Sequence, residues 1–322
     1  MASIGNSIRH HARLRPDAVA LIEDGVLGLH DEICRWLPEF AEPAVLREVT
    51  GPLSDTGPAD RPITVFHLLA MTAGWGVLLQ DCPLQSAIDE REIGSGPAPP
   101  QMTGDEFVRR LAELPLAFQP GAGWLYDTPV KVLSVLLARA AGMQLGDVLA
   151  QRLTQPLGMA DTGFWADADR LPAPYRPVGD GVEDIELPDG AFVRPPLFED
   201  LSCGLVSTAP DLLRFFSAMA DGGAPVLHPE SVRLMTTDQL TVDQRMQGLP
   251  ILGLGVSWGL GVAVDVEAVS PWMAPGRWGW TGGSGTSAHV HPDGSVAVFL
   301  SQRELADAQD GFDDFWAAVS VG

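Results

Sequence analysis

Residues 118–165 read FQPGAGWLYDTPVKVLSVLLARAAGMQLGDVLAQRLTQPLGMADTGFW, and this stretch decides the fold prediction. Apolar residues recur with helical periodicity over 129–141, and Gly142 follows as a typical stop signal. A second helix is expected over about 144–153. Tyr126 stands just before the first helix, after a turn rich in glycine. The stretch therefore predicts two consecutive helices with a tyrosine at the entrance to the first.

On both sides of this stretch the chain divides into a mainly helical part and a late strand-rich part. After residue 250 the segments LGVSWGLGVAVDV, GTSAHVHPDG and SVAVFLSQ alternate between apolar and polar residues, which is typical of antiparallel strands. Residues 165–200, with their prolines, are expected to be irregular. The other predicted helices cover about 29–41, 63–76, 104–114, 207–223 and 304–319. This order of elements indicates an α+β fold.

Length and charge limit the possible partners of this chain. Its 322 residues, 46% of them hydrophobic, are enough for one globular domain with a large core. The formal charge of −22 would repel nucleic acid and anionic membrane, so we expect neither as a partner. We find no apolar run long enough to span a bilayer and no leader-like segment, so we expect a cytoplasmic protein.

Cysteine spacing gives no sign of a metal site. Cys34, Cys82 and Cys203 are far apart and odd in number, so we expect free thiols. We predict no metal and no cofactor, and a small molecule as the substrate.

Five blocks, in this order, resemble the serine β-lactamase-related superfamily, which includes class C β-lactamases, D-alanyl-D-alanine carboxypeptidases and family VIII esterases. The blocks are DGVLGLHDEICRWLPEF (24–40), ITVFHLLAMTAGWG (63–76), the stretch 118–165, CGLVSTAPDLLRFFSAMADGG (203–223) and GWTGGSGTSAHVHPDGSVAVFLSQRE (279–304). The resemblance implies a β-lactamase/transpeptidase-like fold, with an antiparallel sheet flanked by helices and an all-helical lobe. We expect a single domain over 1–322, its helical lobe about 60–225 and its sheet lobe about 1–40 and 250–322.

The family's chemistry suggests roles for two motifs of this chain. Members use a serine nucleophile in Ser-x-x-Lys, a tyrosine in Tyr-x-Asn that relays a proton, and a Lys/His/Trp-Thr-Gly strand. Tyr126, in YDT, stands where the general acid/base tyrosine belongs. Thr128 replaces the usual Asn or Ser at the third position, which alters a substrate contact.

The second motif is WTG, formed by Trp280, Thr281 and Gly282, at the place of the Lys/His-Thr-Gly strand. Tryptophan at the first position resembles the esterase branch more than the β-lactamases. Gly282 and Gly283 would let the strand backbone approach a substrate closely. We also consider Trp75 as a residue that lines the cleft.

The nucleophile is the unsettled element, because Lys131 is the only lysine and no Ser-x-x-Lys pair exists. ASIGNS near the N-terminus looks like the family motif with Asn6 in place of lysine, which would make Ser3 the nucleophile. Ser7 fits the family spacing better, with His10 in place of the lysine. In a third reading, residues 7–25 are similar to the opening helix and strand of acyl-adenylating enzymes and do no chemistry. Lys131 either contacts the substrate region beside Tyr126 or faces solvent.

The resemblance also implies two strands and a helix before the nucleophile, and the sequence shows none. The strand near 295–301 would then have an exposed edge. Residues 17–23 or a second protomer would cover this edge, and for that reason we predict a homodimer.

Three hypotheses for function remain open. The first is an esterase-like hydrolase or acyltransferase with Ser3 or Ser7 as nucleophile and Tyr126 as base. The second is a diverged enzyme of secondary metabolism that performs a cyclisation, isomerisation or elimination on a hydrophobic small molecule, with Tyr126 as acid/base. The third is a catalytically inactive binding protein. We favour the second, because a serine without a base is a poor nucleophile.

Overall fold

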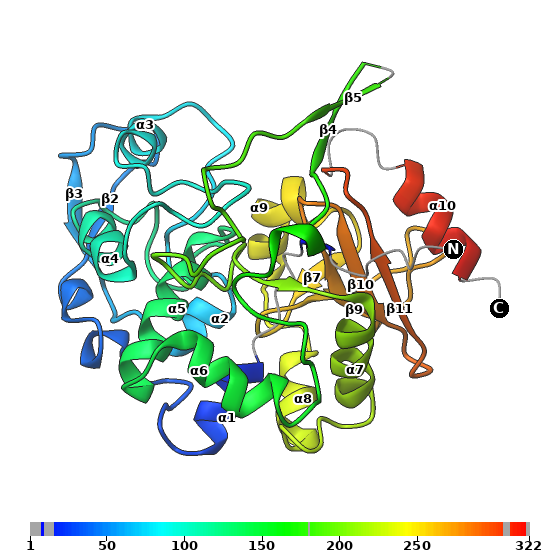
Figure 1. The fold of residues 1–322 in the computed structure, drawn as a ribbon. Coiled ribbons are helices and arrows are strands. Elements are labelled where there is room, and N and C mark those ends of the chain that lie inside the picture. The colour runs from blue at the N-terminus through cyan, green and yellow to red at the C-terminus, as the bar shows by residue number, and fades with distance from the viewer. Residues whose placement is uncertain (1–7, 10–15, 180, 305–309, 320–322) are drawn as a thin grey trace.

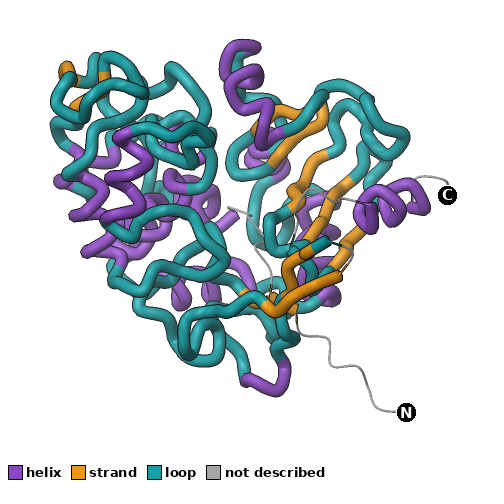
Figure 2. The backbone as a smooth tube through the Cα atoms, turned by 90° about the horizontal axis from the view of Figure 1, so that it is seen from above, coloured by secondary structure: helices purple, strands orange, loops and turns teal. Residues whose placement is uncertain are grey.

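A computed structural model describes residues 8–9, 16–179, 181–304 and 310–319 of the chain. Helices α2 to α6 gather on one side of the molecule and an antiparallel sheet stands on the other (Figures 1 and 2). The helices are α1 (Pro16–Glu23), α2 (Val65–Leu69), α3 (Pro83–Glu90), α4 (Gly104–Ala112), α5 (Thr128–Ala141), α6 (Leu145–Leu149), α7 (Ala209–Ala220), α8 (Pro229–Met235), α9 (Val242–Leu252) and α10 (Asp310–Val319). The strands are β1 (Ile8–Arg9), β2 (Ala44–Leu46), β3 (Thr56–Pro58), β4 (Tyr175–Val178), β5 (Gly181–Asp184), β6 (Val206–Ser207), β7 (Val256–Trp258), β8 (Ala263–Asp265), β9 (Trp278–Thr281), β10 (Thr286–Val290) and β11 (Val296–Leu300).

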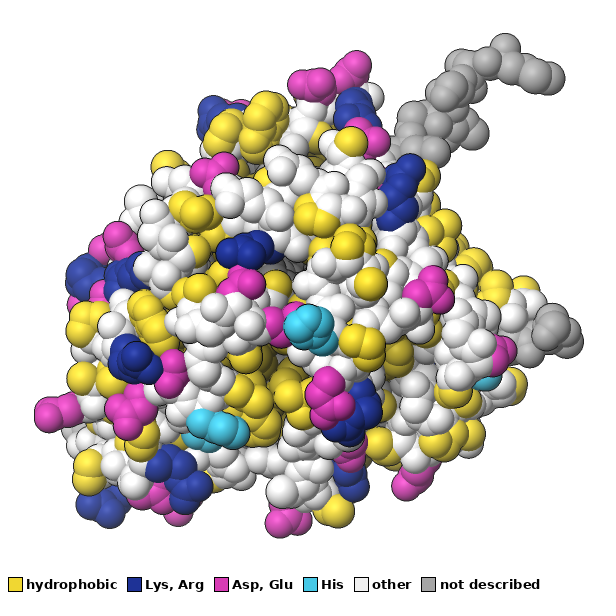
Figure 3. Space-filling view, turned by 90° about the horizontal axis from the view of Figure 1, so that it is seen from below, with side chains coloured by type: hydrophobic (Ala, Val, Ile, Leu, Met, Phe, Trp, Pro, Cys, Tyr) yellow, Lys and Arg dark blue, Asp and Glu magenta, His cyan; other side chains and the backbone are white. Residues whose placement is uncertain are grey.

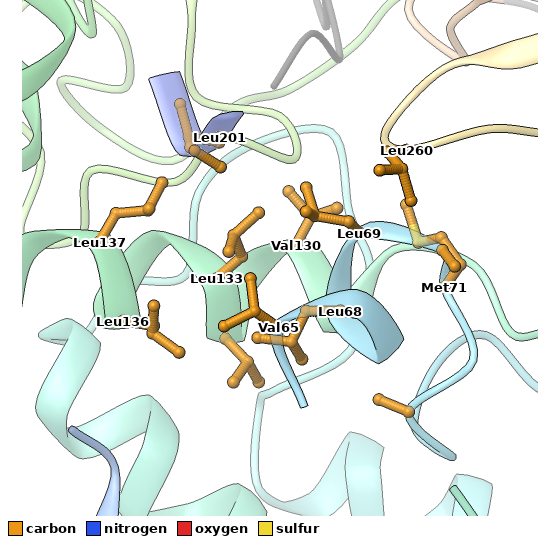
Figure 4. Close-up of a cluster of buried hydrophobic side chains, with 14 of the residues drawn as sticks. Val65, Leu68, Leu69, Met71, Val130, Leu133, Leu136, Leu137, Leu201 and Leu260 are labelled. Atoms are coloured by element: carbon orange, nitrogen blue, oxygen red, sulfur yellow. The ribbon is translucent and has the colours of Figure 1, made fainter. Parts of the chain in front are cut away.

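Helix α5 is the central helix of the helical part. Its residues 128–137 are all buried, so it is covered on every side rather than along one stripe. Leu68 and Leu69 of α2 lie near Val130 and Leu133 of α5 in the core (Figure 4). Each such side chain contributes about 1.5–3 kcal/mol when fully buried. The helix predicted over 129–141 is therefore confirmed, with Gly142 as its left-handed C-cap.

The main sheet has five antiparallel strands in the order β11-β10-β9-β8-β7. In the register of β9 and β10, Trp280 pairs with Ala288 and Thr281 with Ser287. Helix α7 packs against β10 and β11, and α10 packs against β11. The β-lactamase/transpeptidase-like architecture expected from the sequence, helices beside an antiparallel sheet, is the one that the structure shows.

Three local expectations differ from the structure. Residues 29–41 form two 3₁₀ turns, Ile33–Arg35 and Pro38–Phe40, instead of one helix, because Pro38 has no N–H to continue it. Residues 17–23, which we expected to cover the strand edge, belong to helix α1, and Pro16 begins that helix at a position where proline is favoured. The region 165–200 contains the hairpin β4–β5, which projects from the molecule (Figure 1).

The boundary between the helical and sheet parts also differs from the expected one. We expected residues 1–40 with the sheet, yet α1 contacts the π-helical turn Ala150–Thr154, and the turn Pro38–Phe40 contacts α4. Conversely, α7 falls within the expected helical lobe but packs on the sheet.

One face of the molecule carries charged and hydrophobic side chains side by side. On the face shown in Figure 3, acidic and basic side chains are interspersed, and a recess near its centre is lined by hydrophobic side chains. Across the described part of the chain, no single helix is long and apolar enough to cross a membrane; the bent pair Thr128–Ala141 and Leu145–Thr154, at 81°, passes by length and composition only.

Candidate active site

Tyr126 and Trp280, which the sequence analysis singled out separately, are in direct contact. The Trp280 indole N–H donates a hydrogen bond of 2.7 Å to the Tyr126 phenol oxygen. The two ring centroids are 5.2 Å apart, and Trp124 stacks on the tyrosine at 5.9 Å. Trp258 completes this group, with its ring 6.3 Å from that of Tyr126. Three tryptophan side chains therefore hold the Tyr126 ring in place where helix α5 begins.

The backbone around Tyr126 is held as firmly as its ring. The Val77 N–H donates to the Tyr126 carbonyl at 3.0 Å. Gly76 makes this approach possible, since a Cβ there would lie 2.6 Å from the same carbonyl oxygen. Asp127, the next residue, has φ +83°, a conformation that is costly for a residue with a side chain. The site thus stores backbone strain next to its tyrosine.

Asp127 belongs to a buried cluster of charged and hydroxyl groups around Lys131. The Lys131 ammonium donates to the Asp127 carboxylate at 2.7 Å and to the Ser202 hydroxyl at 2.5 Å. It also lies 3.2 Å from the Asp200 carboxylate. Ser95 donates its hydroxyl proton to the Asp127 carboxylate. Because Lys131, Asp127 and Asp200 are each at most 1% exposed, these contacts are made away from water.

Electrostatics fix the protonation state of the cluster. Burial alone would lower the pKa of Lys131, but the carboxylates of Asp127 and Asp200 outweigh it and raise that pKa above its ordinary value. Burial, and then the Asp200 charge, raise the pKa of the Cys203 thiol well above its ordinary value. Lys131 is therefore a cation and Cys203 a neutral thiol at neutral pH.

A cavity of about 170 Å³ opens beside this cluster. One part of its lining is polar. It comes from Tyr126, from the cluster around Lys131 and from the turn after β9. The rest is apolar and comes largely from loops around the β4–β5 hairpin. The polar part includes Ser95, Tyr126, Asp127, Cys203, Gly283 and Ser284, and the apolar part includes Pro97, Pro172, Pro174, Ile185, Leu187 and Phe192.

Gly283 and Ser284, in the turn between β9 and β10, line this cavity. The turn is closed by bonds from the Gly282 N–H to the Thr286 carbonyl at 2.7 Å and from the Gly285 N–H to the Gly282 carbonyl at 3.0 Å. Within the described residues, the N–H groups of Gly283 and Ser284 have no acceptor. Two backbone N–H groups at a cavity are the usual elements of an oxyanion hole.

Several predicted site residues lie away from the cavity lining. Thr128 and Lys131 are buried in the first turns of α5 and do not belong to the described lining of the cavity, so Lys131 does not face solvent. Thr281 bonds Ser287 at 2.8 Å within the sheet. Trp75 is buried and packs on Phe40, with ring centroids 4.6 Å apart.

The proposed nucleophiles Ser3 and Ser7, together with His10, lie outside the described residues. The sequence analysis missed Ser95, Asp200, Cys203 and Ser284. Its only related signal was the Gly- and Pro-rich composition of residues 80–104, which is typical of a functional loop.

The described residues contain no group of three or more His, Cys, Asp or Glu side chains that could hold a metal ion. The cavity itself offers a phenol at Tyr126, backbone N–H groups at Gly283 and Ser284, and the Ser95 hydroxyl next to a carboxylate.

Comparison with known proteins agrees with this geometry. A family model described as Beta-lactamase matches residues 18–322. Protein Rv1367c of Mycobacterium tuberculosis is 36% identical over 303 residues, which cover 89% of this chain and 74% of the relative. Esterase EstB of Burkholderia gladioli is 32% identical over 313 residues, covering 90% and 74%.

A solved structure with a similar fold is also described as a hydrolase. EstCE1, described as a hydrolase with promiscuous acyltransferase activity, superimposes with a TM-score of 0.81 at 26% identity, covering 99% of this chain and 85% of that one. These similarities favour the hydrolase or acyltransferase hypothesis over the cyclisation, isomerisation or elimination that we expected first.

Proposed function

This chain belongs to the Beta-lactamase family, and on that premise we propose that it cleaves neutral esters in the cavity beside Tyr126 and passes the acyl group to water or to a second alcohol. The observation that carries the proposal is the presence of Tyr126 and the N–H groups of Gly283 and Ser284 around one cavity. Similarity to EstB and EstCE1 supports the reaction class.

The geometry assigns a separate task to each part of the site. The Trp280 N–H donates to the Tyr126 oxygen, so the phenol proton points away from Trp280 and towards another acceptor. Tyr126 would give this proton to the departing alcohol. The N–H groups of Gly283 and Ser284 would stabilise the negative charge that develops on the carbonyl oxygen.

The lining also favours a neutral substrate. Asp127 and Glu304 are acidic residues of the lining, and no lysine or arginine belongs to it among the described residues. An anionic substrate would lose its hydration without gaining a cation as partner. The apolar walls suit a small acyl group, because a cavity of about 150 Å³ is known to hold a benzene-sized molecule.

The test uses the two tyrosines of the chain, Tyr126 and Tyr175. We expect the protein to hydrolyse p-nitrophenyl butyrate and Tyr126→Phe to lower kcat/KM by about 100-fold or more, because a proton donor is lost. Tyr175→Phe, on strand β4, is the matched control and should retain the activity. Folded protein without ester turnover, or equal losses in both variants, would contradict the proposal. Ser3 and Ser7 stay predictions for the nucleophile.

A further inference from the structure

Phe192 lines two cavities: the inner cavity of about 170 Å³ described above, and an outer cavity of about 340 Å³. Two segments of the chain pass along both. In the first segment, Pro97 lines the inner cavity and Pro99 lines the outer one. In the second segment, Leu187 lines the inner cavity and Gly190 lines the outer one. The outer cavity therefore continues from the inner one, and Phe192 lies at the boundary between them.

The side chain of Phe192 is buried at this boundary and not in the main core. Phe192 is 4% exposed, yet it does not belong to the main hydrophobic core cluster of the described residues. A phenylalanine ring is among the largest apolar groups that a protein can place at one position. Its loss from the boundary would therefore leave space that joins the two cavities.

The backbone of Phe192 is strained, which argues that its ring is needed there. Its φ is +63°, a left-handed conformation that is unfavourable for a bulky residue and easy for glycine. The Ala166 N–H donates to the Phe192 carbonyl at 2.8 Å and helps to hold this conformation. Strain of this kind persists only where the surroundings impose it, and it is concentrated at ligand clamps and functional sites.

The outer cavity has walls that suit a hydrocarbon chain. Phe164, Pro195 and Leu197 belong to its lining. The charged residues of the lining include Asp189 and Arg194, whose side chains are exposed and lie 3.7 Å apart. An apolar chain gains free energy when it leaves water for such walls, and it needs no charged partner there.

We propose that Phe192 sets the length of the acyl group that the enzyme accepts, because its ring closes the inner cavity off from the outer one. This inference rests on the function proposed above, and it holds whichever serine is the nucleophile. With Phe192 in place, an acyl chain has to end within the inner cavity, so short acyl groups are favoured. Phe192 has no step in the reaction and acts by excluding longer chains.

The experiment compares kcat/KM for p-nitrophenyl butyrate and p-nitrophenyl octanoate, which share a leaving group and differ in acyl length. We expect the original protein to prefer butyrate. Phe192→Ala should shift the ratio towards octanoate by about 10-fold or more, because the longer chain gains apolar contacts in the outer cavity. Phe192→Leu keeps a large apolar side chain and should retain most of the preference for butyrate.

Phe164→Ala is the matched control, since Phe164 is also 4% exposed and belongs to the lining of the outer cavity but not to that of the inner one. It should leave the ratio unchanged, because Phe192 still closes the passage. Circular dichroism checks that each variant is folded.

The outcomes separate this inference from the function proposed above. Equal losses on both esters in Phe192→Ala would show a merely structural role and overturn the inference. An original protein that cleaves octanoate as well as butyrate, or an equal shift in Phe164→Ala, also overturns it. In each of these cases ester turnover is present, so the proposed function stands. Folded original protein without turnover of either ester overturns both proposals.

Discussion

Lys131 lies between two carboxylates beside the cavity, whereas Arg277 pairs, among the described residues, with the carboxylate of Asp265 beside the C-terminal helix. Both sites are buried, and the distances are similar, at 2.7 and 3.2 Å for Lys131 and 3.2 Å for Arg277. The pKa of Lys131 is raised, because two carboxylates outweigh the effect of burial. Burial lowers the pKa of Arg277 and raises that of Asp265, although the two attract each other.

The comparison separates two roles of buried charge. For Arg277 and Asp265, the loss of hydration exceeds the attraction, so the pair does not favour its own ionised form. Arg277 instead gains from stacking, with its guanidinium 4.5 Å from the ring centroid of Trp316 in α10. For Lys131 the attraction exceeds the loss. The number and distance of the carboxylates around a buried cation thus decide whether attraction or burial has the larger effect on its pKa.

The largest expected effect is that of Lys131→Met. This change leaves the carboxylates of Asp127 and Asp200 buried without their shared cation, and we expect the free energy of unfolding to fall by about 3–5 kcal/mol. Urea denaturation monitored by tryptophan fluorescence measures it. The control is Arg233→Met, which breaks an exposed pair with Glu230 and should change little. A loss below about 1 kcal/mol in Lys131→Met would show that the cluster is not held by its charge.

An intermediate effect is expected for Arg277→Met. The single change should cost about 3 kcal/mol, since Asp265 is then buried without a partner. The double variant Asp265→Leu, Arg277→Met should return to within about 1 kcal/mol of the original protein, because the hydration penalty of both groups disappears. A double-mutant cycle from urea denaturation tests this. If the double variant is as unstable as the single one, the pair contributes more attraction than its pKa shifts indicate.

Much of the fold could be predicted from sequence, because helix α5 and the late strands carry periodic patterns of apolar residues. Two site residues, Tyr126 and Trp280, could also be predicted, since each lies in a motif whose place in the chain is fixed by neighbouring blocks. Their contact across 154 positions follows from the fold and not from either motif alone.

The cluster around Lys131 could not be predicted, for a physical reason. Ser95, Asp127 and Asp200 come from two loops and a helix start, and no periodicity links such segments. Lys131 was expected at a substrate contact or in solvent, because an isolated lysine is seldom buried. It is buried because two carboxylates, one of them 69 positions away by residue number, meet it in space.

The smallest expected effect is a difference in pH dependence between the two buried sites. The pKa of Asp265 is raised in the folded protein above its ordinary value of 3.8, so the folded state binds that proton more tightly than the unfolded state. Its contribution to stability is therefore present below pH 3.8 and is lost as the pH rises through the raised pKa. The pKa of Lys131 is raised above 10.5, so its contribution persists at neutral pH and is lost only as the pH rises above 10.5.

Asp265→Asn separates the two contributions, because it removes the acidic titration and leaves that of Lys131. We expect its free energy of unfolding, measured in urea from pH 3 to 7, to fall less with rising pH than that of the original protein. Each unit of pKa difference between the folded and unfolded states corresponds to about 1.4 kcal/mol. Above pH 10.5 the two proteins should lose stability in parallel, because both retain Lys131. Identical curves in the acid range would mean that attraction from Arg277 cancels the effect of burial, and the contrast between the two sites would disappear.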